Sequence, residues 1–197
     1  MNENVSNIST FDEWMPNIYY VDISEYSAVT EDAIANNKYG VYISTGEGIH
    51  AYHGKSPIDY RLCKHLGVRV VELNYDGGII IGSANDLSII IVFPASLNMT
   101  HSIMINKIRD IIGKYIPDTT IDRNDILVNG EKVSGSMTRQ VGDCFVWAAQ
   151  ISFADYSDYI HLICSKPSIK KPAYIDSNLL TRDNLEAEIL AWLQKQS

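Results

Sequence analysis

Two short stretches of the chain place small residues where a ligand could reach the main chain. In NGEKVSGSMTR (129–139), Lys132 is followed by a Val-Ser-Gly-Ser tract, and in YDGGIII (75–81) two glycines, Gly77 and Gly78, are adjacent. Glycine leaves backbone N–H groups open to an approaching group, and the lysine adds one amine. Taken alone, each stretch is more often a tight turn between two strands.

Other residues that could do chemistry do not form a familiar site. His50 and His53 are three residues apart on an expected strand, so their side chains point to opposite faces and predict no metal pair. Asp122 and Asp125 have the same spacing and predict no paired acid and base. The motifs of phosphate loops, serine-hydrolase elbows and zinc-binding helices do not occur. We therefore expect no metal site and no familiar hydrolase.

Composition narrows the possible partners. The 197 residues are 46% hydrophobic and 20% charged, with a net charge of −8, and the pI is near 5.0. Such an acidic chain is a poor general binder of nucleic acid or of an anionic membrane. The sequence has no apolar run of roughly 18 residues that could span a bilayer, and its first twenty residues lack the order of a signal peptide. We expect a cytoplasmic protein.

Length and cysteine usage predict the domain organisation. Residues 1–14 are polar and read as a flexible lead, and 15–197 fit one globular domain with a real core. The three cysteines, Cys63, Cys144 and Cys164, are odd in number and far apart. This pattern favours reduced, mostly buried thiols over a disulfide framework or a zinc site.

Hydrophobic patterning interleaves strands with helices. Residues 40–45 and 48–54 alternate around Gly-Glu-Gly, which predicts a hairpin. Residues 102–116 carry an apolar stripe at helical spacing, and Thr181 can cap a C-terminal helix. The expected strands are 17–24, 40–45, 48–54, 68–74, 77–81, 87–93, two around the Asn-Gly turn within 125–137, and 145–153. The expected helices are 25–37, 57–67, 102–116, 155–163 and the one that Thr181 caps. Because several strands join through hairpins, we predict an α+β fold with a mixed β-sheet flanked by helices.

Read together, VRVVELNYDGGIIIGSANDL (68–87) and RNDILVNGEKVSGSMTR (123–139) resemble the lipoate-protein ligase family, a branch of the biotin/lipoate protein ligase and octanoyltransferase superfamily. Members carry a segment like Arg-Arg-x-Ser-Gly-Gly-Gly-x-Val-x-His-x-x-Gly-Asp/Asn-Leu, then Asn-Asp-Ile followed by Gly-Lys-Lys-Val-Ser-Gly-Ser-Ala. The second block matches in type and spacing at Asn124, Asp125, Ile126, Gly130, Lys132, Val133, Ser134, Gly135 and Ser136. The resemblance covers about residues 18–165 and implies the fold of the biotin/lipoate protein ligase catalytic domain.

The resemblance also implies a reaction. A carboxylic acid such as lipoate would react with ATP, with Mg²⁺, to form an acyl-adenylate, and a lysine of a lipoyl-type carrier protein domain would then take the acyl group. The resemblance makes Lys132 catalytic, because its ammonium would stabilise the charge that grows near the acyl carbonyl and α-phosphate. It assigns Asn124 and Asp125 to nucleotide or metal binding. Ser134, Gly135 and Ser136 would leave room for the adenylate along the strand.

The first block departs from the family pattern. With Gly77 and Gly78 set on the last two family glycines, the arginine pair falls on Glu72 and Leu73, the first glycine on Asp76 and the histidine on Gly82. A carboxylate close to a phosphate would cost on the order of a few kcal/mol. Glu72 and Asp76, together with the two glycines, therefore become candidates for binding an acid that bears a positive group.

Three functions remain open from the sequence. The first is a diverged ligase that activates a carboxylic acid with ATP. The second is a non-catalytic relative that binds a small molecule or a protein partner. The third is an octanoyltransferase with a thiol nucleophile, although none of the three cysteines falls in a matched motif. A basic cluster, Lys166, Lys170 and Lys171, could dock an acidic carrier, or could simply be a solvated loop.

Overall fold

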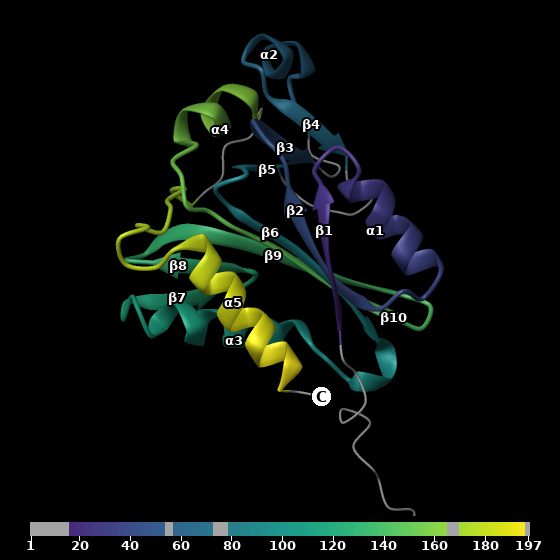
Figure 1. Cartoon of the computed structure of the whole chain (residues 1–197). Coiled ribbons are helices and arrows are strands. Elements are labelled where there is room, and N and C mark those ends of the chain that lie inside the picture. Colours follow the sequence, from purple (N-terminus) through teal and green to yellow (C-terminus); the bar gives the residue numbers. More distant parts are fainter. Residues whose placement is uncertain (1–15, 54–56, 73–78, 165–169, 196–197) are drawn as a thin grey trace, which may run out of the picture.

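The computed structural model describes residues 16–53, 57–72, 79–164 and 170–195 (Figure 1). The expected lead at 1–14 lies outside the described residues, as do Asp76, Gly77 and Gly78. No helix in the described ranges is long and apolar enough to cross a membrane.

A seven-stranded sheet forms the centre of the fold. Its strand order is β1-β2-β6-β10-β9-β8-β7. The strands are β1 (Asn17–Asp22), β2 (Gly40–Thr45), β6 (Leu87–Pro94), β7 (Thr119–Asp122), β8 (Asp125–Val128), β9 (Glu131–Val141) and β10 (Cys144–Ile151). β1 and β2 are parallel, and all other neighbours are antiparallel. The predicted α+β class with a mixed sheet is confirmed.

Helices cover both faces of this sheet. Along β6, Ile89, Ile91 and Phe93 belong to the core cluster under α3 (His101–Gly113) and α5 (Arg182–Gln194). Ile90 and Val92 alternate with them and belong to the cluster under α1 (Tyr26–Ala35). Figure 1 shows α3 and α5 together on one side and α1 on the other. Burial on both faces explains why 87–93 is an unbroken apolar run.

The two helices on which the sequence was most explicit are confirmed. In α3 the side chains of Met104, Ile108, Ile111 and Ile112 are buried, as the apolar stripe predicted. In α5 the Thr181 hydroxyl accepts a hydrogen bond from the backbone N–H of Asn184 at 3.2 Å, which satisfies one unpaired donor of the first turn. α3 therefore packs on the sheet through the face that the sequence indicated, and α5 begins at the cap that the sequence predicted.

A second sheet has three strands in the order β4-β3-β5. They are β3 (Ile49–His53), β4 (Arg69–Glu72) and β5 (Ile79–Ser83), and they form a separate core with α2 (Tyr60–His65) and α4 (Ser157–Ile163). Figure 1 shows this sheet beside the end of the large one, with α2 and α4 on it.

The hairpin expected between 40–45 and 48–54 is wrong, because β2 and β3 lie in different sheets. β2 pairs with β1 and β6, whereas β3 pairs with β4 and β5. Gly46 and Gly48 have φ of +128° and +87°, a backbone region that glycine enters at low cost. The chain therefore turns out of one sheet and into the next, and the alternating pattern could not say which partner each strand takes.

The Asn-Gly hairpin predicted within 125–137 is confirmed. β8 and β9 are antiparallel neighbours, joined at Asn129 and Gly130, which have φ of +51° and +77°. Positive φ at both central residues is the geometry that matches the twist of two hairpin strands. This turn places Lys132 near the start of β9, opposite Leu127, and Gly135 opposite Asp125 at the start of β8.

Candidate functional site

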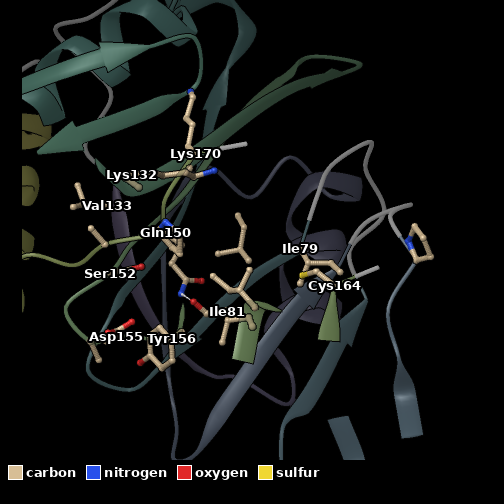
Figure 2. A pocket seen from close by; sticks show the side chains of 18 residues that line it. Ile79, Ile81, Lys132, Val133, Gln150, Ser152, Asp155, Tyr156, Cys164 and Lys170 are labelled. Atoms are coloured by element: carbon tan, nitrogen blue, oxygen red, sulfur yellow. Dashed lines mark hydrogen bonds between the residues drawn. The ribbon is translucent and has the colours of Figure 1, made fainter. Parts of the chain in front are cut away.

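A cavity of about 270 Å³ is lined by residues of both sheets (Figure 2). β5 contributes three isoleucines, β9 contributes residues 132–135, and the segment after β10 contributes Ala154 to Tyr156. α4 and the segment 170–173 complete the wall. The full set is Pro57, Ile79, Ile80, Ile81, Lys132, Val133, Ser134, Gly135, Gln150, Ser152, Ala154, Asp155, Tyr156, Ile160, Cys164, Lys170, Pro172 and Ala173.

The cavity has a charged end and an apolar wall. Lys132 and Lys170 lie together at one end, and Ile79 and Cys164 lie on a wall away from them (Figure 2). Most small-molecule sites combine apolar walls with a few placed polar groups. The arrangement suits an apolar molecule that carries an anionic head group.

The Lys132 amine is held at the cavity by a carboxylate. Its Nζ lies 2.9 Å from Oδ1 of Asp125, and the Lys132 side chain is 29% exposed. A Cβ at Gly135 would lie 3.3 Å from this Nζ and 3.7 Å from Asp125 Oδ1. The space beside Gly135 is therefore occupied by the Lys132 amine of the chain itself. The sequence analysis had expected a ligand to occupy that space.

Ser134 and Ser136 have different surroundings. Ser134 is buried and lines the cavity, whereas Ser136 is not among the lining residues. The Ser136 hydroxyl donates to the backbone oxygen of Asn124 at 2.9 Å and contacts His101 Nε2 at 2.8 Å. Burial lowers the pKa of His101. The hydrogen bond from Ser136 to the backbone carbonyl of Asn124 thus connects β9 to the turn before β8.

Of the proposed binding residues in the first block, only Glu72 falls within the described residues. Glu72 is exposed and does not line it; the Glu72 carboxylate accepts a hydrogen bond from the Tyr60 hydroxyl at 2.8 Å. That bond raises the pKa of Tyr60. Asp76, Gly77 and Gly78 lie outside the described residues.

Gln150 lines the cavity but was not among the site residues predicted from the sequence. Its side-chain amide donates to the backbone oxygen of Ile81 at 2.8 Å and accepts from the Ser88 hydroxyl at 3.2 Å. A Cβ at Gly82 would lie 1.7 Å from Gln150 Nε2, which no side chain could tolerate. Gly82, where the family pattern has a histidine, is therefore bare because Gln150 fills the space. The one signal in the sequence was a polar residue inside the apolar strand 145–153.

Cys164 is the cysteine that lines the cavity. It follows α4 directly, and burial raises the pKa of its thiol. Cys63 and Cys144 are also free, and both are buried but are not among the lining residues. The sequence treated the three cysteines alike, because only packing shows which of them reaches a cavity.

An aspartate and a tyrosine close the end of the cavity opposite the lysines. Asp155 accepts from the backbone N–H of Ser157 at 2.9 Å, and hydrogen bonds from Ser157 lower the pKa of this carboxyl. The Tyr156 hydroxyl donates to Ser83 at 2.6 Å, and burial raises its pKa. Among the described residues, no group of three or more histidine, cysteine, aspartate or glutamate side chains could hold a metal ion.

Several solved structures resemble this fold at low sequence identity. P. falciparum LipL1 in complex with lipoate has a TM-score of 0.77 at 16% identity, covering 92% of this chain and 62% of that chain. A bi-partite lipoate protein ligase from Thermoplasma acidophilum, solved in a study with its E2 lipoyl domain, has a TM-score of 0.71 at 12% identity, covering 92% and 83%. Lipoate-protein ligase A bound with ATP has a TM-score of 0.70 at 12% identity, covering 93% and 85%.

The present chain thus spans less than two thirds of the LipL1 chain. Biotin protein ligases are also among the structures that match. No protein-family model and no curated protein sequence matches the chain. At such low identity a structural likeness establishes the fold, and it agrees with the sheet order and the helices described above. The chain has the fold of the catalytic domain shared by lipoate-protein ligases and biotin protein ligases.

Proposed function

We propose that the protein is a lipoate-protein ligase-like acyltransferase, formed by residues 15–197, that binds a carboxylic acid in the cavity and passes its acyl group to a lysine of a carrier protein. The observation that carries this proposal is the Lys132 amine at the charged end of a cavity with an apolar wall. The apolar wall would take the acyl chain, and the ammonium would face the carboxyl group. LipL1 solved with lipoate supports an acid of that kind.

Lys132 would act on charge that develops during acyl transfer. In the first step the carboxylate oxygen attacks the α-phosphate of ATP and pyrophosphate leaves, and in the second the carrier amine attacks the acyl carbonyl and AMP leaves. Negative charge grows on a phosphate oxygen in the first step and on the carbonyl oxygen in the second, and a fixed cation nearby lowers both barriers. Asp125 holds the ammonium in place at 2.9 Å, so little reorganisation is needed. The attacking amine belongs to the carrier, for which a lipoyl-type domain is the natural candidate given the T. acidophilum pair.

ATP is the proposed activating co-substrate, and the ATP-bound ligase supports it. The described part of the cavity offers the Lys132 ammonium for its phosphates, and Asp125 Oδ1 lies 2.9 Å from it. Among the described residues, Asn124 and Asp125 are the ones proposed to lie nearest to the nucleotide, as the resemblance assigned them. Magnesium would enter with the phosphates, because fewer than three acidic, histidine or cysteine ligands gather anywhere in the described ranges.

A second candidate function is acyl transfer through Cys164, because this thiol lines the same cavity as Lys132. In that route the thiolate would attack the carbonyl of an acyl thioester, the donor thiol would leave with a proton, and the carrier lysine would then displace the Cys164 sulfur. Burial raises the pKa of Cys164, so the resting thiol is protonated and needs a base before it can attack.

Pyrophosphate release tests the first candidate. The wild-type chain with ATP, Mg²⁺ and lipoate or octanoate should release pyrophosphate, and Lys132→Ala should reduce the rate by roughly 100-fold or more. Cys164→Ser should leave that rate nearly unchanged. Circular dichroism of both variants would show that the fold is retained.

Octanoyl thioester transfer tests the second candidate. If Cys164→Ser abolishes transfer from an octanoyl thioester while no acid gives pyrophosphate, the thiol route replaces the ligase route. Binding of octanoate without either reaction would leave the non-catalytic binding module as the function. Failure to bind any of lipoate, octanoate or biotin would end the carboxylic-acid proposal.

A further inference from the structure

The segment 170–173 holds the backbone of Lys132 from outside the sequence motif. The Lys132 N–H donates to the Lys171 carbonyl at 3.0 Å, and the Ala173 N–H donates to the Lys132 carbonyl at 2.8 Å. Pro172 and Lys132 form a parallel bridge. Both hydrogen-bonding groups of the Lys132 backbone are therefore satisfied by this one segment.

The same segment also contacts the partner of the Lys132 side chain. Lys170 Nζ lies 2.6 Å from Asp125 Oδ2, 2.8 Å from Asp122 Oδ2 and 3.0 Å from the Asp122 carbonyl oxygen. The Lys170 side chain is 24% exposed and that of Asp125 is 17% exposed. The Asp122 carbonyl and Asp125 Oδ2 accept hydrogen bonds from this ammonium, and the Asp122 carboxylate forms an ion pair with it. Lys170 is thus placed to hold Asp125.

Asp125 divides its two oxygens between the two lysines. Oδ2 contacts Lys170, and Oδ1 contacts Lys132 at 2.9 Å. The terminal torsion of an aspartate is soft, so a carboxylate with one mobile partner can rotate with that partner. With Oδ2 fixed, Oδ1 has a defined position, and its ion pair with Lys132 holds the ammonium at the cavity. Figure 2 shows the two lysines together at this end of the cavity.

We propose that Lys170 is a positioning residue for the acyl-transfer site, acting through Asp125 to fix where the Lys132 ammonium lies. This inference rests on the proposed function for its catalytic meaning, but the geometry that it asserts can be measured without turnover. A single partly exposed ion pair would fix the amine weakly, whereas a network with a second lysine restricts it more. It also turns Lys170 from a candidate carrier-docking charge into part of the site.

The test compares Lys170→Met with Lys171→Met. Both changes remove one lysine charge from the same segment and keep an unbranched side chain. The Lys171 side chain is 74% exposed and pairs with Glu131, so it serves as the matched control. Lys170→Arg is the conservative variant, because a guanidinium can also bridge two carboxylates.

Crystal structures of the three variants give the readout that is independent of activity. In Lys170→Met we expect Asp125 to rotate and the Lys132 amine to leave its place over Gly135, while both stay in Lys171→Met and Lys170→Arg. If Lys132 and Asp125 keep their contact and position in Lys170→Met, the inference is overturned.

The rate of pyrophosphate release without carrier gives the second readout. Lys170→Met should lower kcat by roughly 10- to 100-fold, the cost of a displaced catalytic group, with a smaller change in KM for the acid. Lys171→Met should match the wild type, and Lys170→Arg should recover most of the loss. An equal loss in the Lys171 variant would contradict the assignment. If the wild type releases no pyrophosphate with any acid, the proposed ligase function fails, and the crystal structures still decide the role of Lys170.

Discussion

Side-chain size at position 135 controls where the Lys132 amine can lie. Gly135 pairs with Asp125 across β8 and β9, and the Lys132 amine reaches Asp125 over the bare glycine. The resemblance in sequence identified all three positions without showing that they contact one another. At the scale of residues, the motif is therefore a local arrangement of one cation, one anion and the space between them.

Gly135→Ala should impair the site and spare the fold. The new Cβ would lie 3.3 Å from the Lys132 amine, and a flexible side chain can move away from it. We expect at least a tenfold loss of acyl transfer, because small displacements of a catalytic group are costly, with a change in unfolding free energy of no more than about 1 kcal/mol. Gly113→Ala, where a Cβ meets nothing within 4 Å, is the control. Undiminished transfer in Gly135→Ala would show that the amine position is unimportant.

Gly82 and Gln150 should behave as one unit in urea unfolding. Gly82→Ala displaces the Gln150 amide from Ile81 and Ser88, which leaves buried polar groups unpaired at a cost of about 1–3 kcal/mol. Gln150→Ala removes the same hydrogen bonds. The double variant should cost less than the sum of the two single variants. Strict additivity would mean that the two positions do not share this space.

At the scale of elements, the Asp86 carboxylate joins the turn between β5 and β6 to the end of β10. It accepts from the backbone N–H of Ser83 at 2.7 Å and of Phe153 at 2.6 Å. Arg182, the first residue of α5, donates to the Asp86 carbonyl at 3.2 Å. Three parts of the fold therefore meet at one buried residue, which is 1% exposed.

The raised pKa of Asp86 leads us to expect that the free energy of unfolding depends on pH. Burial raises the pKa of Asp86 above the ordinary value of 3.8, against the opposing effect of its hydrogen bonds. A raised pKa means that the folded chain binds the proton more tightly than the unfolded chain. Its contribution to stability is then fully present below pH 3.8 and is lost as pH rises through the raised value.

Urea unfolding of the wild type and Asp86→Asn across this range measures that contribution. The free energy of unfolding of the wild type should fall relative to that of the asparagine variant as pH rises. Asp183→Asn, at a carboxyl that is 86% exposed, is the control for removing one acidic group. A wild-type advantage that grows with pH would contradict the raised pKa.

At the scale of the whole molecule, the cavity connects two sheets that have separate cores. β5 belongs to the three-stranded sheet, and β9 and β10 belong to the seven-stranded one. α2 and α4 pack with the small sheet, while α3 and α5 pack on the large one. A ligand in the cavity would contact both parts, so its binding free energy should stabilise the folded molecule as a whole.

Octanoate should therefore raise the unfolding temperature. Ligand at about 100 times its Kd adds about 2.7 kcal/mol to the free energy of unfolding. Differential scanning calorimetry should show one transition that moves upward with octanoate. Lys132→Ala should weaken or abolish the shift, because the carboxylate loses its cation, whereas Lys171→Ala should retain it. An equal rise in unfolding temperature in Lys132→Ala would mean that the octanoate carboxylate does not bind at Lys132.

The sequence by itself determined most of the elements and the local block that carries Lys132. Buried strands, the stripe of α3, the cap of α5 and the Asn-Gly turn follow from periodicity and local backbone preference, which act over a few residues. The same locality fixed Lys132, Asp125 and Gly135 as one block around a hairpin. Local patterns predicted that β2 and β3 pair with each other, which is wrong, and they did not predict β7. Strand pairing depends on segments that lie far apart in the sequence.

Only the tertiary structure decided which distant side chains complete the cavity. Lys170 reaches Asp125 from 45 residues along the chain, and Gln150 fills the space at Gly82. Cys164 lines the cavity while Cys63 and Cys144 do not. None of these contacts has a periodic signal, because each depends on how two sheets and a returning segment pack in three dimensions.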